Sequence, residues 1–165
     1  MIYQFHYSFP IGRLCIQEEN EKIIGIHIVE NITDKGNSDK EFLQIKEEET
    51  PFIKRVHSQL TEYFGGQRQD FNLPLNPSGT EFQQKVWKAL CTIPYGETCS
   101  YQDIAGKIGN PKACRAVGGA NNKNPIIIII PCHRVIGADG SLVGYGGGLS
   151  VKEYLLDLEK CCLPE

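Results

Sequence analysis

The chain has 165 residues and lacks any apolar run long enough to cross a bilayer, since the longest, Ile126–Ile130, falls far short of the roughly 20 residues required. No basic N-terminal stretch precedes an apolar one, so we expect no signal peptide and no membrane attachment. C-x-x-C spacing is also missing, and the odd number of cysteines, seven, disfavours a disulfide scaffold. Free thiols fit a reducing compartment, and we expect a cytoplasmic protein.

An overall excess of positive charge is missing too, because the net formal charge is −3. The charge is unevenly distributed, however. Between Lys85 and Arg134 the sequence has seven Lys and Arg against two Asp and Glu. Charge alone allows a basic binding face in the second half, but it favours an ordinary solvated surface.

The first third of the chain alternates between apolar and polar residues, which is typical of strands with one buried face. The alternating segments are Phe5–Phe9, Leu14–Ile16 and Ile24–Ile28. We expect an antiparallel meander. A covering helix is predicted to begin at Pro51 with Thr50 as its N-cap, and to end at Gly65.

A proline-bearing connector over residues 71–79 separates this unit from the rest. We therefore expect two domains, 1–78 and 79–165. The first would be an α/β supporting domain.

The second unit is predicted to begin with two helices, each opened by a capping box. The cap residues are Thr80 with Gln83, and Ser100 with Asp103. A third helix is expected over residues 112–121. Ser150 is predicted to cap the last helix of the chain, with Tyr154 on the buried side of that helix. Two short helices across a tight glycine turn outline a helix-turn-helix, which many proteins unrelated to DNA also contain.

The run Ile126–Ile130 is bounded by prolines and rich in β-branched residues, so it predicts a strand buried on both faces. This strand would deliver Cys132 and His133 to its end. A cysteine beside a histidine indicates an activated thiol, and Glu159 is a candidate to orient the histidine. Considered alone, the pair is more typical of an inert buried cysteine beside a core histidine.

The segment Pro131–Val135, with the sequence Pro-Cys-His-Arg-Val, stands with four other distinctive segments. These are Thr80–Trp87, Ile93–Thr98, Arg115–Asn121 and Gly146–Leu149. Together they resemble the motif set of the O6-alkylguanine-DNA alkyltransferases, also called methylated-DNA–protein-cysteine methyltransferases, over essentially all of residues 79–160. The fold that we expect is α+β: a small antiparallel sheet with a covering helix in a ribonuclease-H-like outline, then a mostly helical winged helix-turn-helix domain that carries the active site.

The resemblance implies that Cys132 takes a methyl or larger alkyl group from O6-alkylguanine, and from O4-alkylthymine, in one irreversible turnover that repairs the DNA directly. His133 would act through water as the base, and Glu159 would orient and polarise it. Tyr101 would help to rotate the target nucleotide and could donate a proton to the leaving guanine. No cofactor is needed for this chemistry.

The resemblance also implies that a monomer binds double-stranded DNA through the minor groove and flips the damaged base out of the stack. Arg115 would fill the space that the base leaves. The rest of the DNA-contacting set would be Ala116, Gly118, Gly119, Asn121 and Tyr101. Glycines cost about 1 kcal/mol each inside a helix, and close approach of this helix to DNA would offset that cost.

The pocket would be built by Asn124, Pro131, Val135, Tyr145 and Gly146. Asn124 would satisfy backbone groups between the helix-turn-helix and the acceptor cysteine, and Tyr145 with its glycine-rich loop would wall the guanine.

Three features depart from relatives. Several members of the family hold zinc in the N-terminal domain, but Cys15 and His27 lack convincing partners here, so we expect no metal. Ile127 stands where some members have Pro or Ala beside the pocket, and Gly146 replaces a hydroxyl residue of some relatives.

Three other functions remain as alternatives. A relative that only binds alkylated DNA would lack the acceptor, and Cys132 is present. A winged-helix regulator would use Cys132 as a sensor. A Cys-His hydrolase would turn over and would not depend on DNA.

Overall fold

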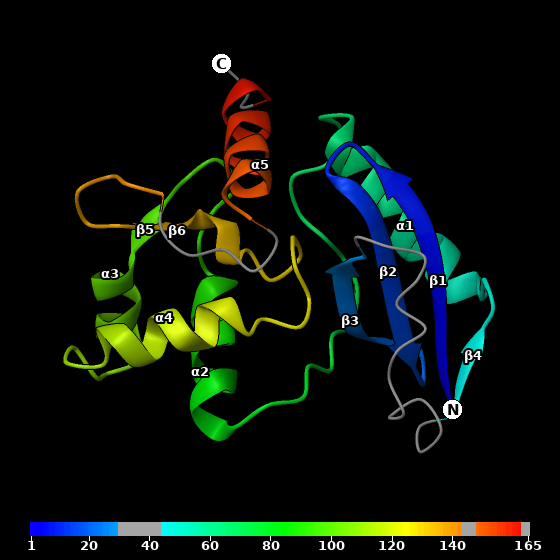
Figure 1. The fold of residues 1–165 in the computed structure, drawn as a ribbon, viewed down its shortest axis with the longest axis horizontal. Coiled ribbons are helices and arrows are strands. Elements are labelled where there is room, and N and C mark those ends of the chain that lie inside the picture. Colours follow the sequence, from blue (N-terminus) through cyan, green and yellow to red (C-terminus); the bar gives the residue numbers. More distant parts are fainter. Residues whose placement is uncertain (30–43, 143–147, 163–165) are drawn as a thin grey trace. The chain divides into compact units, whose positions relative to one another are not determined.

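The computed structural model describes residues 1–29, 44–142 and 148–162 (Figure 1). The chain forms two compact units, Met1–Pro77 and Ser78–Glu165. The boundary expected from the connector lies one residue further along. Each unit is described by itself below.

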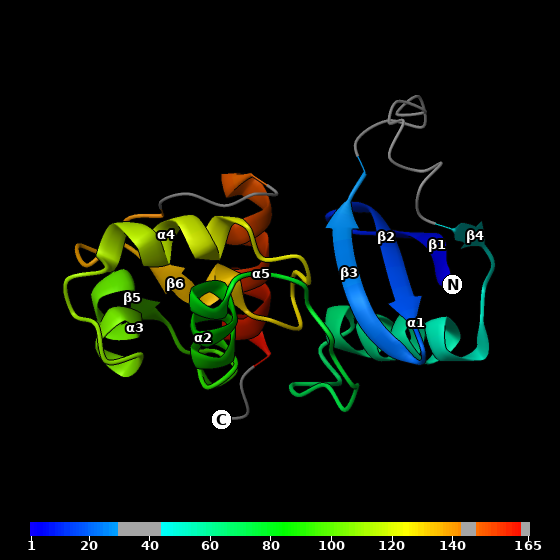
Figure 2. The ribbon, with the colours of Figure 1, turned by 90° about the horizontal axis from the view of Figure 1, so that it is seen from below.

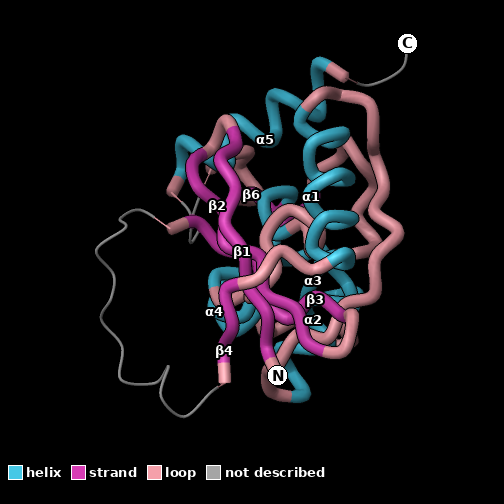
Figure 3. Tube along the Cα trace, turned by 90° about the vertical axis from the view of Figure 1, so that its right-hand side faces the viewer, coloured by secondary structure: helices cyan, strands magenta, loops and turns pink. Residues whose placement is uncertain are grey.

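The first unit contains a sheet of four strands in the order β3-β2-β1-β4 (Figure 3). Strands β1 (Ile2–Phe9), β2 (Gly12–Glu19) and β3 (Lys22–Ile28) pair antiparallel in sequence order, so the predicted meander is confirmed. The short strand β4 (Ile45–Glu47) pairs parallel to β1. Its sequence shows too little alternation for β4 to be predicted.

Helix α1 (Pro51–Phe64) lies along one face of this sheet (Figure 2). It begins as predicted, because Thr50 Oγ1 accepts a hydrogen bond from the backbone N–H of Ile53 at 3.1 Å and Pro51 needs no such partner. It ends at Gly65. The apolar side of the helix and the inward residues of β2 form the core of this unit.

The second unit is built around helices α2 (Glu81–Leu90), α3 (Tyr101–Lys107) and α4 (Cys114–Asn122). Both predicted capping boxes are present, at α2 and α3. Helix α4 begins two residues after the predicted start. The indole N–H of Trp87 on α2 donates to the carbonyl of Ala120 on α4 at 2.9 Å. No helix among the described residues combines the length and apolarity that crossing a membrane requires.

The last helix, α5 (Leu149–Cys161), corrects two predictions. Gly148, with φ +97°, occupies the N-cap position, so the helix begins before Ser150 and has no side-chain cap. Tyr154 is exposed, whereas Lys152 and Glu159 are buried. Two charged residues therefore take core positions, which is possible because buried partners meet them there.

The run Ile126–Ile130 is buried for the most part, but it is not a strand. The N–H of Ile130 donates to the carbonyl of Ile126 at 3.1 Å, and the N–H of Ile129 donates to that of Ile127 at 2.9 Å. Ile128 sits between them with φ +73°, a conformation that β-branched residues rarely adopt. The β-branched residues predicted burial correctly and an extended strand wrongly, because these short-range hydrogen bonds fold the run into a turn. The unit's only sheet in the described residues pairs β5 (Cys99–Ser100) with β6 (Val135–Ile136) in parallel.

Candidate active site

Cys132 begins a short 3-10 turn, η2 (Cys132–Arg134), and is almost completely buried. Pro131 precedes it with φ −81° and ψ 62°, and the N–H of Cys132 donates to the carbonyl of Ile130 at 2.8 Å. Cys132 thus lies in a tight turn rather than at the end of an extended strand. His133 follows within the same turn.

Two asparagines hold this turn through the backbone. Asn124 donates from Nδ2 to the carbonyl of Ile130 at 2.8 Å and accepts from the N–H of Ile126 at 3.0 Å. Asn121 donates from Nδ2 to the carbonyl of Cys132 at 3.4 Å. The turn has few backbone partners of its own, so these side chains replace the pairing that a sheet would provide.

The carboxylate of Glu159, on α5, receives hydrogen bonds on both oxygens although it is only 1% exposed. Its Oε2 lies 2.6 Å from His133 Nε2, and its Oε1 accepts from Arg134 Nε at 2.7 Å and from the N–H of Gly96 at 3.2 Å. Burial alone would raise the pKa of Glu159, but the hydrogen bonds and charges of His133 and Arg134 outweigh it and lower this pKa to about 2. Glu159 is therefore ionised at neutral pH.

His133 is completely buried, and burial lowers its pKa below the ordinary value. Glu159 opposes this shift, while the positive charges of Arg134 and Lys152 reinforce it. A neutral histidine facing an ionised carboxylate must carry its proton on Nε2, which leaves the lone pair on Nδ1. This Nδ1 is buried, and no described residue gives it a hydrogen-bond partner. The geometry thus produces a base with one available nitrogen.

Two buried cations at this site were not predicted. Arg134 is 7% exposed and Lys152 is fully buried, with its ammonium group donating to the carbonyl of Val135. Burial lowers the pKa of Lys152, and the charge that Cys132 carries in its thiolate form opposes that shift. The spacing of Lys152, Leu155 and Glu159, three and then four residues apart, was the available signal, because it places all of them on one helix face.

Tyr101, the first residue of α3, lies close to Cys132. Burial raises the pKa of Tyr101, and the charge that Cys132 carries in its thiolate form raises it further. Its ring also approaches α4, since a Cβ on Gly118 would come within 3.9 Å of it. The structure therefore brings Tyr101, α4 and Cys132 together.

The outer face of α4 carries Arg115, Ala116 and Gly119, all exposed. A Cβ on Gly119 would meet nothing within 4 Å, so the glycine leaves open surface rather than room for a neighbour. Asn121 points inward instead, as its bond to Cys132 requires. The lysines counted as a basic face are exposed, but Arg134, counted with them, is not part of the surface.

The remaining predicted positions divide in two. Pro131 and Val135 are buried beside Cys132. Tyr145 and Gly146 lie outside the described residues. Within the described ranges, no three His, Cys, Asp or Glu side chains are arranged to hold a metal ion.

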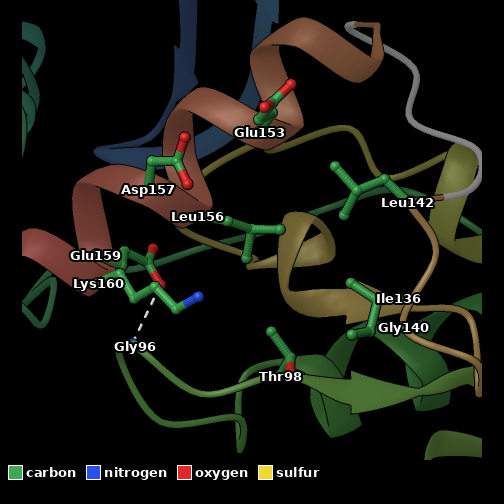
Figure 4. A pocket seen from close by; sticks show the side chains of 10 residues that line it. All are labelled: Gly96, Thr98, Ile136, Gly140, Leu142, Glu153, Leu156, Asp157, Glu159 and Lys160. Carbon is green, nitrogen blue, oxygen red and sulfur yellow. Dashed lines mark hydrogen bonds between the residues drawn. The ribbon is translucent and has the colours of Figure 1, made fainter.

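A cavity of about 370 Å³ lies against the other side of α5 (Figure 4). Glu153 and Asp157 line it from the helix, and Thr98 from the segment before β5. Glu159 also lines this cavity, and there its carboxylate accepts the hydrogen bond from the N–H of Gly96. The cavity is lined by neither Cys132 nor Tyr101, so we assign it no part in the chemistry at the thiol.

Comparison with known proteins gives matches over both units. Residues 81–161 match the family model of the 6-O-methylguanine DNA methyltransferase, DNA binding domain, and residues 1–77 match that of its ribonuclease-like domain. The methylated-DNA–protein-cysteine methyltransferase of Methanosarcina acetivorans is 47% identical over 161 residues, covering 98% of this chain and all of the relative. That of Mycobacterium leprae is 63% identical over 160 residues, covering 97% and 93%. The crystal structure of Mycobacterium tuberculosis OGT in complex with DNA superposes with a TM-score of 0.86 at 44% identity, covering 98% and 95%.

Proposed function

This chain belongs to the 6-O-methylguanine DNA methyltransferase family, and we propose that it repairs DNA by moving an alkyl group from O6 of a damaged guanine onto its own Cys132. One observation supports Cys132 as the acceptor above all others: its thiol shares a buried turn with a histidine whose only available nitrogen is a base. The other cysteines of the described residues have no such neighbour in sequence.

The proposed reaction begins with proton transfer. Nδ1 of His133 takes the thiol proton of Cys132 through one water, and Glu159 stabilises the imidazolium that results. The thiolate then attacks the alkyl carbon, so a carbon–sulfur bond forms while the bond from that carbon to O6 breaks. Tyr101 donates a proton to the leaving guanine, and exchange with solvent then returns a proton to Tyr101 and removes the one held by His133, so that both residues end neutral. Overall the alkyl group goes to sulfur and one proton goes to the base.

The product thioether is stable, and the described part of the proposed site holds no second thiol that could take the alkyl group from it. Each molecule therefore acts once. Because no electron transfer or activated carrier is involved, the reaction proceeds without a cofactor.

We assign DNA contact to the exposed face of α4. Small residues there, Ala116, Gly118 and Gly119, let the helix backbone approach a duplex closely, and Arg115 is long enough to fill the space of a flipped base. Minor-groove docking suits this role, because a lesion scanner must bind with little regard to sequence. Asn121 supports the acceptor turn rather than the DNA contact.

The remaining assignments follow from position. We assign residues 1–78 a supporting role and residues 79–165 the DNA-binding and acceptor role. Pro131, Val135 and Asn124 hold the turn, and Tyr145 with Gly146 walls the guanine. The protein would work as a monomer on double-stranded DNA in the cytoplasm.

Counting repaired bases tests this function. A duplex with one O6-methylguanine is mixed with a limiting amount of protein, digested to nucleosides and analysed for restored deoxyguanosine. Repair should stop at one guanine per protein molecule, should vanish in Cys132→Ser, and should persist in Cys161→Ser, which changes an exposed cysteine. Repair by Cys132→Ser, or many repaired bases per molecule, would contradict the proposal.

A further inference from the structure

Arg134 is the one polar residue of the Pro131–Val135 segment to which the proposed reaction gives no part. Its position is unusual for an arginine, because its side chain is only 8% exposed. A buried guanidinium must be matched by hydrogen bonds and charge, or it destabilises the fold. The hydrogen-bond and charge partners of Arg134 therefore indicate its role.

The guanidinium is anchored in three directions. Nε donates to Glu159 Oε1 at 2.7 Å and Nη2 donates to Oε2 at 3.1 Å, so the arginine grips both oxygens of the carboxylate. Nη1 donates to the carbonyl of Ile93 at 2.8 Å, and the group lies 5.7 Å from the ring centre of Tyr95. This two-point grip fixes where the carboxylate points. Lysine, with a single ammonium group, could not reproduce it.

The same carboxylate oxygen, Oε2, serves both Arg134 and His133. A buried carboxylate needs a positive partner, and without Arg134 the nearest group able to become positive is His133. A histidine that already holds two protons cannot accept one from Cys132. We propose that Arg134 is a positioning residue for alkyl transfer, which holds Glu159 in place and supplies its counter-charge so that His133 stays available as the base. This inference rests on the proposed function of the site.

The other charged groups around His133 agree with this role. Its own turn contributes Cys132 and Arg134, and α5 contributes Glu159 and Lys152. Among the groups that shift the pKa of His133, Glu159 alone raises it, while Arg134 and Lys152 lower it. The charge of Arg134 also acts on Cys91 and Tyr95. Burial raises the pKa of each of these groups, to about 12 for Tyr95, and Arg134 opposes the rise in both. Neither of these is ionised at neutral pH, so neither can replace Glu159 as its partner.

The test is the pH dependence of transfer in Arg134→Met, which removes the charge and keeps most of the volume. The rate constant for reaction with free O6-benzylguanine is measured between pH 5 and 9, which avoids any effect on DNA binding. The acid limb of the profile should move up by at least one pH unit, so that the rate near the old midpoint falls by about tenfold and recovers at high pH. An equal loss at every pH would mean a structural role only and would overturn the proposal.

Two further measurements keep the test decisive if Arg134→Met folds poorly. In the unreacted wild-type protein, NMR titration of the His133 ring should show a neutral ring at pH 7. The ring should gain its second proton only at a pH below the ordinary pKa of histidine. A ring protonated at pH 7 overturns the proposal. In Arg134→Lys the acid limb should stay near that of the wild type, because the charge remains, while the rate falls at all pH values because the two-point grip is lost. If the acid limb of Arg134→Lys moved as far as that of Arg134→Met, the positive charge of Arg134 would not be the cause of the displacement.

These outcomes are separable from failure of the proposed function. A wild-type protein that accepts no alkyl group refutes the function whatever the titration shows. A protein that accepts the group, but whose acid limb does not respond to Arg134→Met, refutes only the role of Arg134.

Discussion

Replacing Glu159 by glutamine should lower the free energy of unfolding at neutral pH and reduce its loss in acid. The folded protein holds the pKa of Glu159 at about 2 against an ordinary 4.5. At about 1.4 kcal/mol for each tenfold change in proton affinity, this depression corresponds to about 3 kcal/mol of stability. The carboxylate is buried, so solvent screening removes little of this.

The sign follows from the direction of the shift. Because the pKa is lower in the folded state, the stabilisation is complete above the unfolded-state value of 4.5 and is lost as the pH falls toward 2. Roughly 2 kcal/mol should disappear between pH 6 and pH 3 by this relation. Glutamine cannot ionise, so the variant loses this contribution at every pH. It also leaves Arg134 buried without its counter-ion.

Urea unfolding, followed by the fluorescence of the buried Trp87, measures both effects. Wild type and Glu159→Gln are compared at several pH values from 6 to 3, and the stability gap between them should narrow by about 2 kcal/mol as the pH falls. Glu153→Gln on the exposed side of the same helix is the matched control, with a small and constant gap. A gap for Glu159→Gln that stays constant across this range would refute the reasoning.

Three further changes test other parts of the site. Arg115→Ala should slow repair of duplex DNA by about tenfold more than reaction with free O6-benzylguanine, since flipping costs a few kcal/mol that the side chain offsets; equal losses in the two rate constants would remove this role. Asn124→Ala removes two hydrogen bonds to the backbone and should lower the free energy of unfolding in urea by about 1–3 kcal/mol. An unchanged unfolding midpoint would mean that the turn is stable without these hydrogen bonds. Ile128→Gly should destabilise less than Ile126→Gly by about 1–2 kcal/mol, because only position 128 is left-handed; equal unfolding midpoints would show that its backbone carries no strain.

Local signals predicted most of the fold. Alternation gave strands β1 to β3, and capping residues gave the starts of α1, α2 and α3, because each of these signals acts within a few residues of the chain. Strand β4 was missed because its pairing with β1 depends on a distant partner rather than on its own pattern.

The errors near the site have one cause. An apolar run was interpreted as a strand, and the burial of Lys152 on α5 was not predicted, because each segment was considered without its neighbours. The side chain of Asn124 replaces the pairing that Ile126–Ile130 would need as a strand. The burial of Lys152 and Glu159 depends on partners that η2 and β6 supply. The sequence could nominate Cys132, His133 and Glu159, but it could not show that Arg134 is buried and bound to both oxygens of Glu159.

The identity of the alkyl acceptor is tested most directly by the mass of the protein after reaction. Fresh reduced protein is mixed with an excess of a duplex that contains one O6-methylguanine, and its intact mass is measured before peptide mapping. We predict a gain of one methyl group per molecule, located on Cys132, with no further gain over time and none in Cys132→Ser. An unmodified protein, or a methyl group found on another cysteine, would contradict the assignment of Cys132 as the acceptor.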